Sequence, residues 1–173
     1  MSTVVLSIGS NLGDRLARLQ SVVDALGDRI RAVSPVYETD PWGGVDQGAF
    51  LNAVVIADDA ELDGRGWLDF AQGLEAAADR MRGQKWGPRT LDVDLVTCHD
   101  GEGELFSRDE GLTLPHPLAH LRAFVLIPWL ATDPHADLTV NGAVQPVSRL
   151  LDDLSADDRD GVRLTALVLG VDS

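Results

Sequence analysis

A five-residue segment in the middle of the chain alternates apolar and acidic side chains. No other feature of the sequence limits the possible local structure as strongly. Leu91, Val93 and Leu95 are apolar, whereas Asp92 and Asp94 lie between them. Successive side chains of a β-strand point to opposite faces, so the two carboxylates would share one face, about 7 Å apart. We therefore predict a strand with one buried face and one acidic face.

The two carboxylates have two interpretations. Magnesium prefers oxygen ligands, and paired metals about 4 Å apart can be held by such carboxylates during phosphoryl transfer. The alternative is an ordinary half-buried strand whose acids are solvated. The Gly-Pro pair before the strand predicts a turn that holds Trp86 and Arg89 beside it. A loop aromatic can flank a base, and the guanidinium could contact phosphate or simply pair with Asp92.

Length and composition exclude several classes of protein. The chain of 173 residues predicts a single domain with its own hydrophobic core. Cys98 is the only cysteine, which excludes an internal disulfide and a cysteine-based zinc site. A net charge of -14 argues against binding to nucleic acid or to anionic membranes. Neither a signal peptide nor an apolar run of about 18 residues is present, so we expect a cytoplasmic protein.

The order of predicted elements favours an antiparallel or mixed α+β sheet, because strands and helices do not alternate regularly. Strands are predicted at 4–8, 31–38 with a break at Pro35, 50–57, 91–98, 104–106 and 164–169. Helices are predicted at 12–26, 62–80 and 123–131, with a helical turn at 117–120. Ser10 or Asn11 would cap the first helix and Gly27 would end it. The acidic segment 152–161 has a composition compatible with mobility.

Several motifs together carry a family resemblance. W-G-P-R-T-L-D-V-D at 86–94, with I-G-S-N-L-G-D at 8–14, resembles the 6-hydroxymethyl-7,8-dihydropterin pyrophosphokinases. Further matches are Y-E-T at 37–39, F-L-N at 50–52, Q-G-L-E at 72–75 and L-T-L-P-H-P at 112–117. The resemblance implies an α+β, ferredoxin-like fold, with a mainly antiparallel sheet layered with helices. It also implies one pyrophosphokinase domain that transfers diphosphate from ATP to 6-hydroxymethyl-7,8-dihydropterin in folate biosynthesis, giving AMP.

The same resemblance implies roles for particular residues. Asp92 and Asp94 would hold two magnesium ions, and Arg80 and Arg89 would act on the triphosphate as catalytic arginines. The residues expected around the nucleotide are Gln72, Glu75, Arg82, Trp86, His116 and Arg122. The residues expected around the pterin are Thr39, Trp42, Phe50, Asn52 and Phe124, with the two phenylalanine rings sandwiching the ligand and the asparagine amide reading its edge. Judged without the resemblance, the arginines could form surface ion pairs, His116 a structural hydrogen bond, and both phenylalanines part of the core.

Three departures from the family pattern stand out. Asp40 occupies a position where an apolar residue or proline is expected, and Pro117 follows His116 where a tyrosine is common. The segment 82–86 is also shorter than in some members. The expected partners are ATP and the hydroxymethyl-dihydropterin, with a monomeric protein. Two alternatives have different products: a non-catalytic binding module would release no AMP, and a magnesium-dependent nucleotidyltransferase would release diphosphate.

Overall fold

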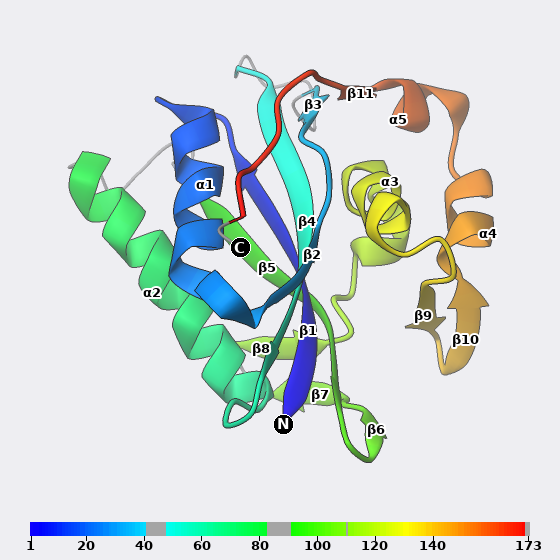
Figure 1. The fold of residues 1–173 in the computed structure, drawn as a ribbon. Coiled ribbons are helices and arrows are strands. Elements are labelled where there is room, and N and C mark those ends of the chain that lie inside the picture. Colours follow the sequence, from blue (N-terminus) through cyan, green and yellow to red (C-terminus); the bar gives the residue numbers. More distant parts are fainter. Residues whose placement is uncertain (41–47, 83–90, 110, 172–173) are drawn as a thin grey trace.

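The computed structural model describes residues 1–40, 48–82, 91–109 and 111–171, without the side chains of residues 80–82. Figure 1 shows the arrangement of its elements. The helices are α1 (Arg15–Leu26), α2 (Gly64–Arg82), α3 (Ala123–Thr132), α4 (Val147–Asp152) and α5 (Ala156–Asp160), with 3-10 turns at Gly27–Arg29 and Ala119–Leu121. The strands are β1 (Ser2–Ser10), β2 (Ile30–Val33), β3 (Tyr37–Thr39), β4 (Phe50–Asp59), β5 (Asp92–Asp100), β6 (Gly103–Glu104), β7 (Ser107–Asp109), β8 (Leu112–Leu114), β9 (Asp137–Val140), β10 (Ala143–Pro146) and β11 (Val162–Leu164).

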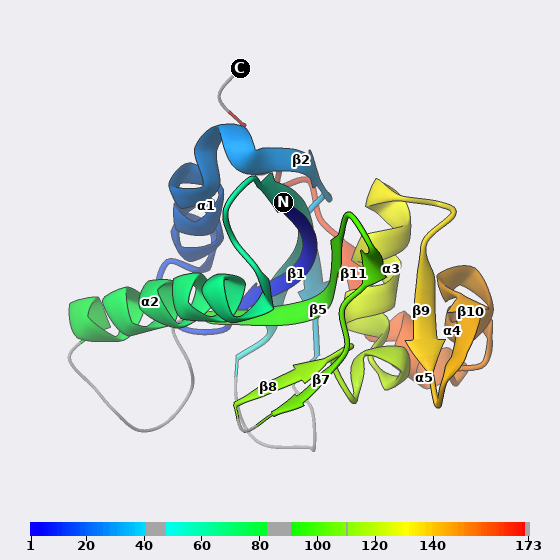
Figure 2. The same ribbon diagram turned by 90° about the horizontal axis from the view of Figure 1, so that it is seen from below.

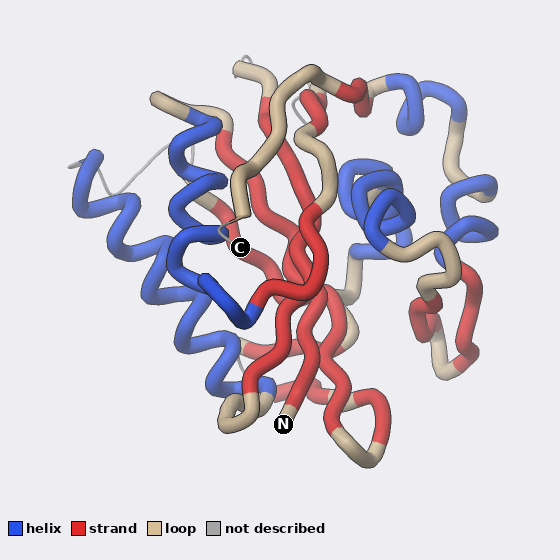
Figure 3. Tube along the Cα trace, in the orientation of Figure 1, coloured by secondary structure: helices blue, strands red, loops and turns tan. Residues whose placement is uncertain are grey.

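The main sheet is built around β1, which lies between β4 and β5. The strand order is β11-β3-β4-β1-β5-β6, and β2 also pairs with β4. Each of these pairings is antiparallel. Two separate hairpins, β7-β8 and β9-β10, flank the sheet. The predicted α+β, ferredoxin-like architecture, a mainly antiparallel sheet layered with helices, is therefore confirmed (Figures 1 and 3).

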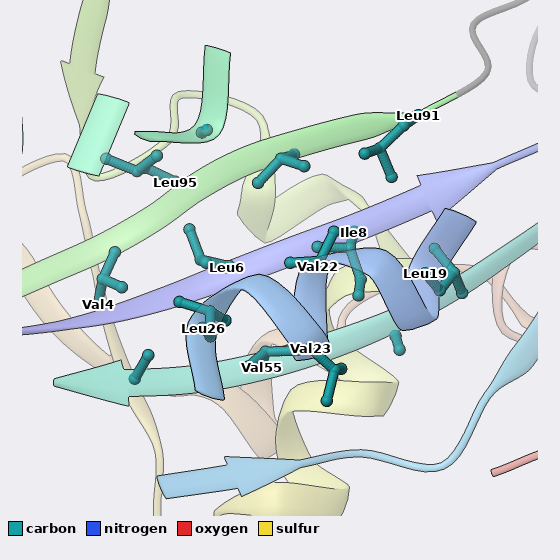
Figure 4. Packing of buried hydrophobic residues seen from close by; sticks show 14 of the residues in the cluster. Val4, Leu6, Ile8, Leu19, Val22, Val23, Leu26, Val55, Leu91 and Leu95 are labelled. Carbon is teal, nitrogen blue, oxygen red and sulfur yellow. The ribbon is translucent and has the colours of Figure 1, made fainter. Parts of the chain in front are cut away.

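Helices cover both faces of the sheet. Viewed from below, α1 and α2 lie on one side of the strands, and α3 and α4 lie on the other (Figure 2). On the α1 side, the labelled core residues in Figure 4 are Val4, Leu6, Ile8, Leu19, Val22, Val23, Leu26, Val55, Leu91 and Leu95. On the α3 side, a second core contains Val5, Val54, Val96, Val125, Leu126, Trp129, Val147 and Leu150. The sheet thus separates two hydrophobic cores.

The predicted elements agree with the structure in type, with two corrections. Asp14, rather than Ser10 or Asn11, caps α1, and its carboxylate accepts a hydrogen bond from the Ala17 N–H at 3.1 Å. This prediction was wrong because β1 extends through Ser10 and the helix begins only at Arg15. Gly27 ends α1 as expected, with a φ of 58° that favours glycine.

The second correction concerns the C-terminal strand, which was predicted at 164–169. The strand β11 instead ends at Leu164, because the next residues form other contacts. The backbone N–H and hydroxyl of Thr165 both donate to the Val36 carbonyl, at 3.1 and 2.8 Å. Leu169 is buried in the α1-side core, and Gly170 exchanges two hydrogen bonds with the Gln20 side chain. The residues after β11 therefore do not extend the strand but pack against Val36 and against Gln20 of α1.

Other elements were not predicted from the sequence. The strands β7 and β8 are only three residues each, and α4 and α5 fall within or beside the acidic segment. In α5, the Ser155 hydroxyl caps the helix by accepting a hydrogen bond from Asp158 N–H at 3.1 Å. Within the described residues, no helix is both long and apolar enough to span a membrane.

Candidate active site

The carboxylate strand has the predicted alternation. Val93 and Leu95 are buried in the α1-side core, whereas Asp92 and Asp94 are half-buried on the opposite face. On the neighbouring strand β1, Gly9 lies opposite Asp92 and Ser7 lies opposite Asp94. The two carboxylates therefore occupy one end of the α3-side face, beyond the hydrophobic core that fills the rest of that face.

A cavity of about 570 Å³ lies beside β5, between α2 and β8. Its size suits a ligand larger than a single ring system. Four predicted nucleotide-binding residues line it: Gln72, Glu75, His116 and Arg122. The lining also includes Leu68 and Thr113, which the sequence analysis did not identify.

A second cavity of about 190 Å³ lies on the α3 side of the sheet, between β3, β4 and the beginning of α3. The predicted pterin-binding residues Thr39, Phe50, Asn52 and Phe124 line it. Phe124 lies far along the chain from the other three residues, so the fold brings them together. The size and mixed lining of this cavity suit a small, flat, polar-edged ligand.

The two cavities meet at three charged side chains. Asp92, Asp94 and Arg122 line both cavities. The Arg122 guanidinium lies 5.5 Å from the centroid of the Phe124 ring, a distance at which a cation–π contact holds both groups. Two carboxylates and one guanidinium therefore stand at the boundary between a large polar cavity and a smaller one lined by aromatic rings.

Asn52 has its side-chain amide fixed by its neighbours. Its Oδ1 accepts a hydrogen bond from the Thr39 hydroxyl at 2.5 Å, and both residues are buried. Its Nδ2 lies over Gly9, where an added Cβ atom would approach to 2.5 Å. Gly9 also lines the smaller cavity and is thus a site residue to which the sequence analysis gave no role, although a glycine within a strand signals close approach of another group. The amide can present a defined edge to a ligand.

His116 is held by two backbone contacts. Its own N–H donates to the Val96 carbonyl at 2.9 Å, and its Nδ1 accepts from the Leu118 N–H at 3.1 Å. Val96 is the extra residue of a bulge in β5, because Val5 pairs with Thr97 and the next residue of β1 pairs with Leu95. Since Nδ1 accepts, the neutral ring carries its proton on Nε2, which can donate to an anion.

Burial lowers the pKa of His116 below its ordinary value of 6.5; the nearby Asp94 carboxylate opposes this effect, and Arg122 adds to it. We expect the ring to titrate below pH 6.5 in a proton NMR titration of the free protein. Replacing Asp94 by Asn should lower the midpoint further. Because the unfolded ring binds its proton more readily, this residue's stabilising contribution is complete above pH 6.5 and is lost as the pH falls toward the folded pKa. A midpoint above 6.5 would contradict this assignment of the ring.

Glu75 has a structural contact as well as a place in the cavity. Its Oε2 accepts a hydrogen bond from the Val93 backbone N–H at 3.0 Å, between the two aspartates. Gln72 lies three residues earlier on α2, on the same side of the helix. Helix α2 thus fixes the position of the carboxylate strand and lines the larger cavity with the same surface.

Several predicted site residues are not placed by the described coordinates. Trp42, Trp86 and Arg89 lie outside the described residues. Arg80 and Arg82 belong to the end of α2, but their side chains are not among those described. In the described ranges, no group of three or more histidine, cysteine, aspartate or glutamate side chains could hold a metal by itself. A metal here would need ligand atoms from a substrate in addition to Asp92 and Asp94.

Comparison with known proteins identifies a family. The family model of 7,8-dihydro-6-hydroxymethylpterin-pyrophosphokinase matches residues 5–134. A Mycobacterium tuberculosis 2-amino-4-hydroxy-6-hydroxymethyldihydropteridine pyrophosphokinase is 63% identical over 169 residues, covering 95% of this chain and 90% of the relative. The Mycobacterium leprae protein of the same name is 60% identical, covering 98% of this chain and 92% of the relative. A protein of the same name from Methylorubrum extorquens is 43% identical, covering 82% of this chain and 88% of the relative.

Solved structures share the fold at low sequence identity. A crystal structure of a Plasmodium falciparum HPPK-DHPS variant with STZ-DHP has a TM-score of 0.63 and 12% identity, covering 87% of this chain. The wild-type Plasmodium protein with STZ-DHP has a TM-score of 0.59 and 13% identity. This chain spans less than half the length of these two proteins, 45% and 43%.

The fold, the two-cavity site and these matches define a pyrophosphokinase. Matches to the family model and to named relatives both extend over most of the sequence. The chain belongs to the 7,8-dihydro-6-hydroxymethylpterin-pyrophosphokinase family.

Proposed function

We propose that the larger cavity binds ATP and the smaller one binds 6-hydroxymethyl-7,8-dihydropterin, for the transfer of diphosphate that characterises this family. The products are AMP and the pterin diphosphate. The observation that carries the proposal is that Asp92, Asp94 and Arg122 line both cavities. A group that must pass between two ligands has to cross the place where their binding sites meet.

Two magnesium ions are the proposed cofactors, held by Asp92 and Asp94. Both residues supply hard oxygen donors on one strand face, which fits magnesium, and phosphate oxygens would complete the ligand set. Bound magnesium neutralises phosphate charge and makes the acceptor hydroxyl easier to deprotonate. The chain's own contribution is to fix both carboxylates: β1 pairs along one edge of β5, and Glu75 holds the Val93 N–H on the other.

In the donor cavity, the proposed phosphate contacts come from His116 and Arg122. The His116 ring is oriented through Nδ1, so its Nε2–H can donate to a phosphate oxygen while the ring stays neutral. Arg122 is held by Phe124 and adds a permanent positive charge. Gln72 and Glu75 line the same cavity and would contact the nucleotide. We also assign Arg80 and Arg89 to the triphosphate, and Arg82 and Trp86 to the nucleotide, as the family resemblance implies.

In the acceptor cavity, Phe50 and Phe124 would sandwich the pterin ring. The Asn52 amide, oriented by Thr39, would hydrogen-bond the polar edge of the ring. Trp42 is assigned to the same pocket from the sequence motif. This arrangement would place the hydroxymethyl group beside Asp92 and Asp94. We further propose that the protein acts as a cytoplasmic monomer formed by one domain over residues 1–173.

A product assay tests the proposal. With ATP, magnesium and the hydroxymethyl-dihydropterin, we expect one AMP per pterin diphosphate formed, and removal of the metal with EDTA should abolish both products. Chromatography with a phosphorus NMR readout distinguishes AMP from ADP and from free diphosphate. Release of free diphosphate would instead indicate a nucleotidyltransferase. Ligand binding with no product from the folded, metal-loaded protein would indicate a binding module.

A further inference from the structure

The C-terminal part of the chain, beyond the residues matched by the family model, supplies a strand that pairs with β3, the strand that carries Thr39 of the acceptor cavity. Strand β11 pairs with β3 in antiparallel register, with Val162 opposite Thr39 and Arg163 opposite Glu38. The Asp40 N–H continues this pairing and donates to the Gly161 carbonyl at 3.1 Å. Figure 1 shows β11 beside β3, ahead of the tail that runs toward α1. Without β11, the three-residue strand β3 would be the edge of the sheet.

Arg163 joins two carboxylates at the end of β3. Its Nη1 lies 3.0 Å from Asp40 Oδ1, and its Nη2 lies 3.4 Å from Glu38 Oε1. Asp40 is the residue that departs from the family pattern, and it lines the smaller cavity. The unusual carboxylate therefore has a specific partner, supplied by a strand that the family motif does not include.

The same network reaches the beginning of β4, the strand that pairs with β3. Glu38 Oε2 lies 3.7 Å from Arg15 Nη1, and that guanidinium nitrogen donates to the Ala49 carbonyl at 2.8 Å. Ala49 directly precedes Phe50, the first residue of β4 and part of the acceptor cavity. A continuous set of charged contacts thus connects β11, the end of β3 and the start of β4.

We propose that Arg163 is a positioning residue for the acceptor site, holding Thr39 and Asp40 in place through its contacts with Asp40 and Glu38. Arg163 itself lines neither of the two cavities. Thr39 orients the Asn52 amide, so a shift of the β3 end alters the polar edge that receives the pterin. Isolated exposed ion pairs have small effects, but here one guanidinium meets two carboxylates of the strand whose backbone β11 also pairs. This inference rests on the proposed use of the smaller cavity for the pterin.

The test compares pterin and nucleotide binding in the full chain carrying Arg163→Gln. With magnesium and a saturating unreactive ATP analogue, calorimetry should show pterin affinity weakened about three- to tenfold. The affinity for the analogue alone should stay within about twofold of wild type. Arg163→Lys should recover part of the loss, because lysine keeps the positive charge but lacks the planar guanidinium that contacts both carboxylates. Arg149→Gln, the same change on the exposed surface of α4, should bind both ligands like wild type.

Two further measurements separate positioning from general stability. The effect of Arg163→Gln should be smaller in a background that already carries Asp40→Asn, since only the contact with Glu38 then remains to be lost. Raising the salt concentration should weaken pterin binding more in wild type than in Arg163→Gln. Unchanged pterin affinity in Arg163→Gln would overturn the inference, as would equal losses for both ligands with a lowered melting temperature.

Asn52→Ala shows which proposal has failed if the expected result is not obtained. This variant should lose most of its pterin affinity, because Asn52 belongs to the acceptor cavity itself. If it loses pterin binding while Arg163→Gln does not, only the positioning role is wrong. If Asn52→Ala binds the pterin normally, the smaller cavity is not the acceptor site, and the inference built on it also fails.

Discussion

Asp94→Asn should lower the rate of AMP formation by about 1000-fold while the protein remains folded. The substitution keeps the shape of the side chain but removes one negative charge from the boundary between the two cavities. Preorganised charges at the reacting group are among the largest contributions to catalysis, and a neutral amide is a much poorer magnesium ligand than a carboxylate. We expect Asp92→Asn to behave similarly. The measurement is the single-turnover rate at saturating ATP and pterin, repeated over a range of magnesium concentrations.

Asp100→Asn is the matched control for this experiment. Asp100 ends the same strand and accepts a hydrogen bond from the Glu102 N–H at 2.8 Å, which an amide oxygen can also accept. It lines neither of the two cavities, so its rate should equal that of wild type. If Asp94→Asn and Asp100→Asn form AMP equally fast, the carboxylates on β5 do not hold the catalytic metal.

Gly9→Ala should reduce pterin affinity by about 100-fold, the loss expected when two hydrogen bonds to the ligand are disrupted. The new methyl group would lie 2.5 Å from Asn52 Nδ2, so the amide must move. Neighbouring strands hold Gly9 on both sides, which prevents the backbone from relieving the contact. Calorimetric titration with the pterin in the presence of an unreactive ATP analogue measures the effect. Binding of the analogue by itself should change little.

A double substitution tests the physical reason for the Gly9 effect. In an Asn52→Ala background the amide is absent, so adding Gly9→Ala should cause little further loss of affinity. Gly101→Ala is the control, because a Cβ atom at that turn position would meet nothing within 4 Å. Additive losses from the two substitutions would show that the methyl group acts through something other than Asn52.

The sequence was most informative where side chains alternate or recur at regular spacing. Leu91, Val93 and Leu95 correctly predicted the buried face of β5, because burial on one sheet face requires a period of two. The same logic identified β4 and the helix α2. Asp14 was missed as a cap because the end of β1 could not be placed to the residue from local sequence. The short strands β7, β8 and β11 were missed or misplaced because they depend on partners distant in the chain.

The site could be predicted only in part, for a related reason. The family motifs identified Asn52 and Thr39 but not the contact between their side chains, since 13 positions separate them along the chain. The steric need for Gly9 follows from the register of β1 and β4, which no local pattern encodes. Asp40 was recognised from the sequence as an anomaly, yet its partner Arg163 lies in a segment for which the motifs gave no role.

The separate hydrophobic cores on the two faces of the sheet have a consequence for protein engineering. Helix α1 packs Leu19, Val22, Val23 and Leu26 against the face opposite the carboxylates, and none of its residues lines either described cavity (Figure 4). The α3 side carries both a core and the residues that line the smaller cavity. Thermostability and catalytic activity should therefore be partly separable traits: selection for heat resistance can vary the buried side chains of α1 while Arg15 is kept, whereas changes beneath α3 will alter both together.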